Sequence, residues 1–574
     1  METILLMVGA FVGYLLAYHT YGRFLARKIF KLNPESVVPS HEFKDGKDYV
    51  PTRRGIIFGH HFTSIAGTGP IVGPAIGVIW GWVPAMIWIF VGSIVMGAVH
   101  DFGSLVLSLR NQGKSVSDIA SDFIGPRVKY VFFLVVFFEL LIVIAIFGLV
   151  IAVIFAMFPA SVFPIWMEVP IAVALGWFIY KRGASVGIST FIAVFAMFAT
   201  VVMGHWLPFS LPAVGPIAPT GLWTILLLIY AFIASTLPVT TLLQPRDYIN
   251  AWQLAVAMTL LIIGVFVAGT TTDIEIVAPA FNPDPVGAPP VLPFLFITIA
   301  CGAISGFHSL VSSGTSSKQL DNERDAQAIG YGSMLMEAAL ATLVIITVAA
   351  GIGMAYETAD GTILTGTAAW NTHYESWAAS TGLGSKINAM VIGSANLIAC
   401  LGIPKSMAVI IMGVFVASFA GTTLDSATRI QRYIIMELAT NIKAPALNRK
   451  YPATAFAVIT AAILAFATGA DGKGALTLWP LFGAVNQLLA TLALLVLTLY
   501  LQRKGGFKYL ITAVPLVFMT FMTMWSVCLN ELNFLEQGNW LLTLINGIIL
   551  LLSVWVVVEG LLVFFRFRRQ AGTS

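Results

Sequence analysis

Apolar segments long enough to cross a lipid bilayer recur along the whole chain. A transmembrane helix needs about 20 mostly apolar residues, and such segments follow one another from residue 1 to residue 563. Only 10% of the 574 residues are charged, whereas about a quarter is typical of soluble domains. The chain is therefore predicted to be an all-α polytopic membrane protein, a single integral membrane domain (residues 1–574) with almost no room for a soluble domain.

The hydropathy pattern predicts about 15 transmembrane helices. They are placed at residues 1–22, 56–79, 82–108, 130–157, 165–180, 186–206, 218–244, 250–270, 291–317, 328–355, 405–438, 451–469, 475–501, 509–528 and 540–563. The first segment lacks a basic start and a small-residue cleavage site, which favours a retained helix over a signal peptide. One more apolar stretch, residues 385–403, fits either a span or a surface helix.

Positive charge in the loops predicts the orientation, because cytoplasmic loops collect Lys and Arg. Residues 23–54 hold eight such residues, which places this loop in the cytoplasm and the N-terminus outside. If residues 385–403 crossed the membrane, every later basic loop would lie outside. They are therefore predicted to form a re-entrant or surface helix on the outer side, which places the C-terminus in the cytoplasm.

Two predicted spans are full of helix breakers. GHHFTSIAGTGPIVGPAIG (residues 59–77) has five glycines and two prolines, and CGAISGFHSLVSSGTSSKQL (residues 301–320) has three glycines and six serines. In a helix interior glycine costs about 1 kcal/mol and proline about 3 kcal/mol, and in lipid each freed backbone group needs a partner. Close helix packing explains isolated small residues, but this density favours unwound backbone that lines a binding site.

The directions of the two broken spans predict an inverted repeat. By the loop charges, residues 56–79 run outward and residues 291–317 run inward, as the first helices of two inverted units would. This is the five-plus-five layout of LeuT-type transporters. It divides the chain into five parts. They are an N-terminal helix and loop (1–55), a first repeat (56–206), inserted helices (207–290), a second repeat (291–501) and extra C-terminal helices (502–574).

A second assignment of the first repeat fits the sequence equally well. The spans 218–244 and 250–270 can be its last two helices, with residues 165–206 peripheral. The sequence leaves both assignments open.

A third polar stretch, SFAGTTLDSATRIQRY (residues 418–433), lies midway along the span 405–438. On a helix Asp425 and Arg429 share one face, so they can form a structural ion pair. In the LeuT-type layout this helix instead faces the first broken span, where hydroxyls opposite unwound carbonyls hold Na⁺ and a carboxylate holds a proton. The predicted coupling residues are Thr422, Thr423, Asp425 and Ser426, with Na⁺ at Thr422, Thr423 and Ser426.

Ionisable groups inside membrane spans are costly and are functional candidates. The sequence places ten in or beside them, at His60, His61, His100, Asp101, Glu139, Asp247, His308, Glu337, Lys405 and Asp425. His60, Asp101 and Glu139 are added to the coupling candidates, and Asp101 or Glu139 would also accept the amino group of a peptide. Asp247, next to Arg246 near the cytoplasmic side, is interpreted as half of a helix-end ion pair.

The broken spans also suit a carboxylate substrate. Half-helix N-termini present free N–H groups to an anion, and histidine changes charge near neutral pH. The predicted substrate-binding residues are His61, Thr63, Ser64, Thr68, Gly69, His308, Ser312, Ser313 and Thr315. Because the first broken span runs outward, its two histidines lie on the cytoplasmic side of the break, which favours proton release or an inner gate.

Five segments together resemble the carbon starvation protein A family. They are GHHFTSIAGTGPIVGPAIG, VHDFGSL, GFHSLVSSGTSSKQLDNE, FAGTTLDSATRIQRY and LWPLFGAVNQLLA. The resemblance covers residues 1 to about 565. It implies a bacterial inner-membrane transporter of the LeuT-type superfamily, in which members take up peptides on carbon starvation or import pyruvate with protons.

The leading functional hypothesis is a secondary transporter of peptides or pyruvate, driven by H⁺ or Na⁺. The sequence contains no P-loop, so direct use of ATP would need a partner. An ion channel and an intramembrane hydrolase are the alternatives, but the sequence has no HExxH and no GxSG pattern to support an enzyme. No cofactor beyond the coupling ion and no nucleic acid is expected. The lipid bilayer and a small molecule are the expected partners, and the oligomeric state stays open.

Overall fold

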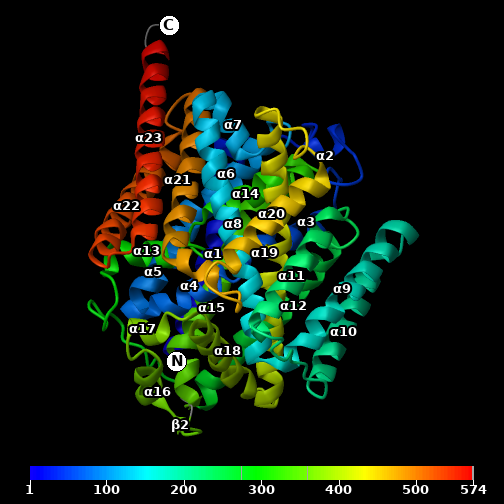
Figure 1. The fold of residues 1–574 in the computed structure, drawn as a ribbon, viewed down its shortest axis with the longest axis vertical. Coiled ribbons are helices and arrows are strands. Elements are labelled where there is room, and N and C mark those ends of the chain that lie inside the picture. Colours follow the sequence, from blue (N-terminus) through cyan, green and yellow to red (C-terminus); the bar gives the residue numbers. More distant parts are fainter. Residues whose placement is uncertain (273, 359, 572–574) are drawn as a thin grey trace.

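The computed structural model of the protein describes residues 1–272, 274–358 and 360–571, so the last residues of the predicted cytoplasmic C-terminus lie outside it. The helices form one upright bundle, with the N-terminus near one end and the C-terminal helix projecting from the other (Figure 1). A small antiparallel sheet of β1 (Tyr356–Glu357) and β2 (Ile363–Leu364) lies at the N-terminal end.

Twelve helical spans in the described residues are long and apolar enough to cross a membrane. Their main helices are α1 (Glu2–Ala17), α5 (Trp82–Gly92) with α6 (Ala98–Leu109), α8 (Pro126–Met157), α9 (Val162–Gly176), α10 (Val186–Gly204), α11 (Pro219–Thr236), α12 (Leu243–Thr271), α15 (Ser333–Ala349), α19 (Lys405–Asn441), α21 (Trp479–Arg503), α22 (Leu510–Glu536) and α23 (Trp540–Ala571). The chain is thus a multi-pass helical membrane protein, as the hydropathy predicts.

The predicted count of about 15 spans stays a prediction. A bent pair, α3 (Arg54–Ala66) with α4 (Gly69–Gly77), raises the count among the described residues to thirteen. The predicted spans 291–317 and 451–469 are also helical, as α13 (Val291–Thr298) with α14 (Gly306–Gly314) and as α20 (Lys450–Ala465). Each of these helices is too short to cross a membrane alone.

Several other short helices lie at the two ends of the bundle (Figure 1). At the end that holds the N-terminus lie α16 (Gly366–His373), α17 (Trp377–Ser380) and α18 (Leu383–Ala399). At the other end lie α2 (Pro39–Glu42) and α7 (Val116–Phe123). The predicted surface or re-entrant helix is α18; it packs against α4, α15 and α19, and its depth in a membrane stays a prediction.

The two helix breaks lie side by side in the middle of the bundle. The first is at Gly67, where φ is +40° and where a Cβ atom would lie 2.5 Å from Thr423 Oγ1. The second separates α13 from α14, and a Cβ on Gly69 would collide with the Cys301 side chain of that break. Only glycine permits this backbone conformation and this close approach, so the two breaks are packed directly on each other.

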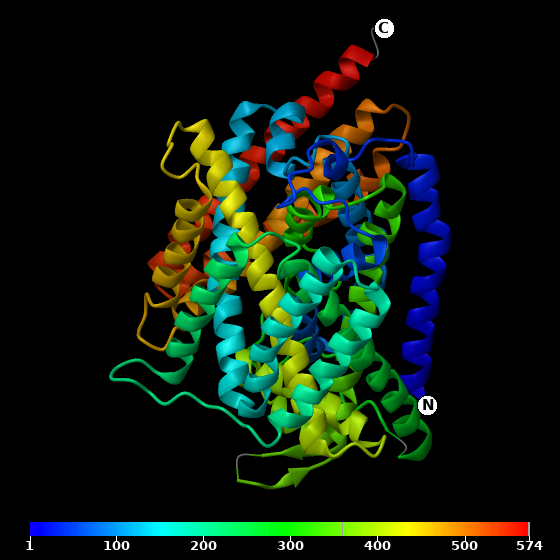
Figure 2. The ribbon, with the colours of Figure 1, turned by 90° about the vertical axis from the view of Figure 1, so that its right-hand side faces the viewer.

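The remaining helices surround these breaks. The helix α12 packs along α3 and also contacts α19, while α11 packs between α8 and α20. The pair α9 and α10 lies at one edge of the bundle (Figure 1), and α1 lines one side of it (Figure 2). Apolar side chains of α10, such as Phe191 and Phe195, are exposed, as expected for a lipid-facing surface.

Candidate functional site

The end of α3 meets the middle of α19 through hydroxyl groups. Thr422 Oγ1 donates to the Thr63 carbonyl at 2.9 Å, and Thr423 Oγ1 donates to the Ser64 carbonyl at 3.3 Å. The hydroxyls of Ser64 and Ser426 lie 2.9 Å apart. These are the last turns of α3 before the break at Gly67, so the structure brings together the coupling residues that the sequence predicts on α19 and the polar residues of the first broken helix.

Asp425 lies on the same turn of α19 and pairs with Arg246 of α12. The Arg246 guanidinium donates to Asp425 Oδ2 in a short ion pair, and the Tyr230 hydroxyl donates to the same oxygen at 2.9 Å. Glu168 of α9 holds the other side of the guanidinium, 3.2 Å from Nε. All of these groups except Tyr230 are buried.

Two sequence interpretations of these charges are wrong. Asp425 pairs with Arg246 and not with Arg429, and Asp247 pairs with His60 and not with its neighbour Arg246. In each case a partner from another helix replaces the partner that is close in sequence. The cause is the burial of α12 against both α3 and α19, which points neighbouring side chains of α12 to different helices.

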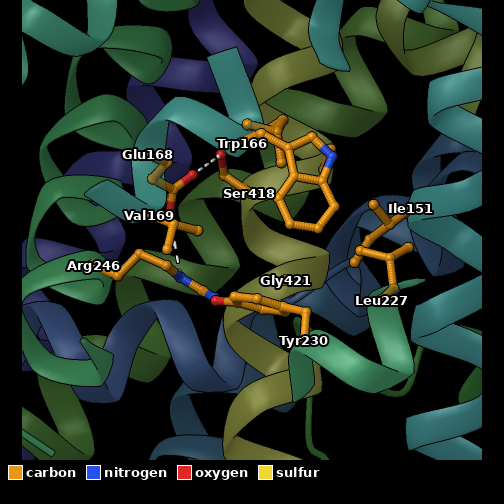
Figure 3. A pocket seen from close by; sticks show the side chains of 11 residues that line it. Ile151, Trp166, Glu168, Val169, Leu227, Tyr230, Arg246, Ser418 and Gly421 are labelled. Atoms are coloured by element: carbon orange, nitrogen blue, oxygen red, sulfur yellow. Dashed lines mark hydrogen bonds and ion pairs between the residues drawn. The ribbon is translucent and has the colours of Figure 1, made fainter. Parts of the chain in front are cut away.

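A small cavity of about 30 Å³ opens beside this ion-pair cluster, large enough for about two water molecules. Glu168, Arg246 and Ser418 form its polar wall, and Trp166 and Tyr230 form its aromatic wall (Figure 3). Ser418 donates to Glu168 Oε2 at 2.8 Å. The Nη2 atom of Arg246 is buried and has no hydrogen-bond acceptor among the described residues. The cavity therefore exposes a spare N–H of a guanidinium to a small ligand.

The two histidines of the first broken helix are bound to different elements. His60 Nδ1 lies 2.5 Å from Asp247 Oδ2, and His61 Nδ1 lies 2.7 Å from the Ser316 hydroxyl, which follows α14. The Gln319 amide lies 3.3 Å from His60 Nε2. Both histidines are buried, so they link α3 to α12 and to the segment after the second broken helix.

His308 of α14 forms a second buried cluster. Its Nδ1 atom lies 2.9 Å from Asp101 Oδ2, and His100 Nδ1 lies 2.8 Å from Asp101 Oδ1. The other ring nitrogen of His308 lies 3.4 Å from Glu337 Oε2, and the Gly302 N–H donates to Glu337 Oε1 at 3.0 Å. The structure thus joins two predicted residues, His308 and Asp101, to Glu337 at the second break.

Other predicted residues stand apart from these clusters. Glu139 of α8 is buried, and neither carboxylate oxygen has a hydrogen-bond partner among the described residues. The Ser313 and Thr315 hydroxyls donate to carbonyls of α14. The Ser312 hydroxyl is buried and has no hydrogen-bond partner among the described residues. The Thr68 carbonyl accepts the first N–H groups of α4. Gly69, the next residue, packs on Cys301.

A further polar cluster lies between α19 and the basic loop after α1. Asp48, in the basic loop after α1, accepts from Arg429 at 2.9 Å and from the Tyr433 hydroxyl at 2.6 Å, and it lies 3.4 Å from Arg432. The Lys318 ammonium lies 4.0 Å from the Tyr433 ring centre. Burial raises the pKa of Asp48, but Arg429 and Arg432 outweigh it and hold that pKa below its usual value.

Sequence reasoning missed Glu168, Tyr230 and Arg246. One available signal was that Glu168 lies inside the predicted span 165–180, where an ionisable residue is a functional candidate by the rule already applied to Glu139. Arg246 follows the span 218–244 by two residues and was assigned to a loop. In the structure it lies inside α12, because α12 begins at Leu243.

Two adjacent broken helices, with a hydroxyl-rich helix against the first, have the arrangement that the LeuT-type layout predicts. A solved structure with this fold, the manganese transporter of Eremococcus coleocola, has a TM-score of 0.53 and 10% sequence identity, and the match covers 91% of this chain and 99% of that chain. At this identity the likeness shows the fold alone.

Residues 2–526 match the family described as "Carbon starvation protein CstA", and the chain belongs to this family. It is 35% identical over 585 residues to the "Peptide transporter CstA" of Campylobacter jejuni, covering 94% of this chain and 81% of that protein. It is 32% identical over 586 residues to the "Pyruvate/proton symporter BtsT" of Escherichia coli, covering 92% and 81%. The resemblance found in the sequence motifs is confirmed, and the chain is a membrane transporter.

Proposed function

We propose that the protein is a secondary active transporter of the bacterial inner membrane that imports peptides or pyruvate together with protons during carbon starvation. The observation that carries this proposal is the Arg246 guanidinium, which lies in the wall of the small cavity and is shared by two carboxylates. The relatives named as a peptide transporter and as a pyruvate/proton symporter support the substrate class.

The charges of this cluster couple a proton to a carboxylate. Arg246 contributes one positive charge, and Asp425 and Glu168 contribute two negative charges when both are ionised. A carboxylate substrate needs the guanidinium as its bidentate partner, but two resident carboxylates occupy it and repel an anion. A proton on Asp425 frees the guanidinium, so the proton and the substrate enter together and the net charge of the cluster stays the same.

A polar path leads from this cluster toward the cytoplasmic loop. Asp247 follows Arg246 in α12 and binds His60, which adjoins the Gln319 amide. Gln244 donates to both Gln319 and Thr52, at 2.5 and 2.9 Å. This path gives the proton an exit to the inner side, in line with the predicted role of the first histidine in proton release.

The packing supports the second assignment of the repeats. In an inverted repeat the fifth helix of the first unit would lie along the broken helix and the facing helix of the second unit. The helix α12 has this position against α3 and α19, whereas α9 and α10 lie at the edge of the bundle. We therefore assign α11 and α12 to the first unit, with α9 and α10 as a peripheral pair, and keep the N-terminus outside and the C-terminus in the cytoplasm.

Sodium is the alternative coupling ion, and one observation favours it. The Thr422 and Thr423 hydroxyls contact the Thr63 and Ser64 carbonyls, and the Ser426 hydroxyl contacts the Ser64 hydroxyl. Oxygen ligands of this kind suit a hard cation. The Na⁺ and H⁺ mechanisms differ in which gradient drives accumulation of the substrate.

Reconstituted uptake tests the proposal. Proteoliposomes receive labelled pyruvate or dipeptide, with a pH gradient or a Na⁺ gradient imposed separately. We expect accumulation with an acidic exterior and no added Na⁺. Arg246→Lys keeps the charge but loses the planar fork, so it should impair uptake, whereas Arg110→Lys, at the salt bridge with Glu323, should not. Accumulation on a Na⁺ gradient alone, passive equilibration or hydrolysis of the dipeptide would each contradict the proposal.

A further inference from the structure

We propose that Cys301, His308 and Glu337 form a binding site for a divalent metal ion of the Zn²⁺ class at the second helix break. The Sγ atom of Cys301, a ring nitrogen of His308 and a carboxylate oxygen of Glu337 all lie within 4.8 Å of one another. The site is separate from the Arg246 cavity and does not depend on the transport mechanism proposed above.

The spacing of the two buried ligand atoms fits a tetrahedral metal ion. Bonds from Zn²⁺ to nitrogen and oxygen are about 2.1 Å long, so two such ligands lie roughly 3.4 Å apart. His308 Nε2 and Glu337 Oε2 are separated by 3.4 Å. Cys301 lies on the unwound segment between α13 and α14, where its thiol donates to Ser305 at 3.4 Å. Three protein ligands leave a fourth position open.

Each ligand is held by a second group, as metal ligands are. The Nδ1–H of His308 donates to Asp101 Oδ2, which leaves Nε2 with its lone pair directed at the site. His100 in turn donates to the other oxygen of Asp101. Oxygen Oε1 of Glu337 accepts the Gly302 N–H. A chain of carboxylate, histidine and open nitrogen is the usual support of a metal-bound imidazole.

The atoms that face the site lack other partners. His308 Nε2 and Glu337 Oε2 are fully buried and accept no hydrogen bond among the described residues. Burying such groups without a partner is costly, and two carboxylates beside one imidazole leave negative charge inside the membrane. A divalent ion satisfies both the lone pairs and the charge, and the thiolate selects a late transition metal over Mg²⁺ or Ca²⁺.

A metal-free explanation uses only part of this geometry. A protonated His308 would bridge Asp101 and Glu337 without any ion, and the Cys301 thiol would then only donate to Ser305 and pack on Gly69. Cys301 is also the only one of the three ligands that is partly exposed, so it is the entry point for an ion. The two explanations therefore differ in what happens at Cys301.

The first experiment measures metal binding to the purified full-length protein in detergent. After treatment with a chelator, Zn²⁺ is titrated by calorimetry, and Co²⁺ is titrated as an absorbing probe for thiolate ligation. We expect one equivalent of each, with a thiolate-to-Co²⁺ absorption band that disappears in Cys301→Ser and persists in Cys400→Ser. Asp101→Asn, a change in a supporting residue, should lower the affinity by about 10- to 100-fold.

The second experiment measures how fast the Cys301 thiol is alkylated in a folded protein that keeps all three ligands. In the double variant Cys400→Ser and Cys528→Ser, Cys301 is the only cysteine left, and its alkylation by a maleimide is timed with and without Zn²⁺. With free Zn²⁺ at about ten times its Kd the metal-free fraction falls about 10-fold, so we expect alkylation to slow about 10-fold and Glu337→Gln to remove most of this protection. An unchanged alkylation rate, or Co²⁺ binding that survives Cys301→Ser, would overturn the site. Failure of the transport proposal changes neither readout.

Discussion

Replacement of Asp425 by asparagine tests the coupling mechanism most sharply. The side chain keeps its size, and its carbonyl still accepts the Tyr230 hydroxyl that now lies 2.9 Å from Oδ2. Only the negative charge beside Arg246 is lost. If protonation of Asp425 is the step that frees the guanidinium, the asparagine copies the protonated state permanently, so the variant should bind substrate without waiting for a proton.

The structure sets the size of the stability effect. Removing one partner of a buried ion pair costs about 3–5 kcal/mol when it leaves the other charge uncompensated. In Asp425→Asn, Arg246 keeps Glu168 as a counter-ion at 3.2 Å, so the loss should be that of one hydrogen bond to a charged group, about 1.5–3 kcal/mol. Arg246→Met leaves two buried carboxylates facing each other and should cost the larger amount.

Two assays separate folding from coupling. Thermal unfolding in detergent should rank the wild type above Asp425→Asn and that variant above Arg246→Met. In proteoliposomes Asp425→Asn should exchange substrate across the membrane but should not accumulate it on a pH gradient. Accumulation at the wild-type level in Asp425→Asn would refute the role of this carboxylate, and so would a loss of exchange in a well-folded variant.

Three further predictions concern other parts of the bundle. The folded-state pKa of Asp48 is depressed, so its stabilising effect is present above the ordinary aspartate pKa of about 3.9 and is lost as the pH falls below that value. Asp48→Asn should therefore make the melting temperature fall less steeply as the pH is lowered through this range. Gly67→Ala should lower stability by at least about 1–2 kcal/mol, since φ is positive there and the Cβ would meet Thr423, and a wild-type melting temperature would contradict it. Glu139→Gln removes a carboxyl with no hydrogen-bond partner among the described residues and should preserve or raise the melting temperature; a fall of several degrees would show that its charge is used.

Local sequence signals were enough to locate the breaks. The glycines and prolines of residues 59–77 and the glycines and serines of residues 301–320 disfavour a continuous helix whatever surrounds them, and the chain unwinds at Gly67 and around Gly302. The contact of α19 with the first break followed from the LeuT-type layout. Thr422 and Ser426 accordingly lie against α3.

The charged partners could not be predicted in the same way, because they depend on which helices are neighbours. Spacing along α19 placed Arg429 beside Asp425, but Arg429 binds Asp48 from a loop 381 residues earlier in the chain. Arg246 reaches Asp425 only because α12 packs against α19. Glu337 and Cys301 join His308 because α15 and the second break pack together. Hydropathy and periodicity carry no information on such distant contacts.

The central claim is that one proton enters with each substrate carboxylate through the Arg246 cluster. The direct measurement is the internal pH of proteoliposomes that contain a trapped pH-sensitive dye, with no gradient imposed, after pyruvate or a dipeptide is added outside. The account predicts internal acidification that depends on the substrate and is absent in Asp425→Asn. Substrate entry by the wild-type protein without acidification, or acidification that persists in Asp425→Asn, would contradict it.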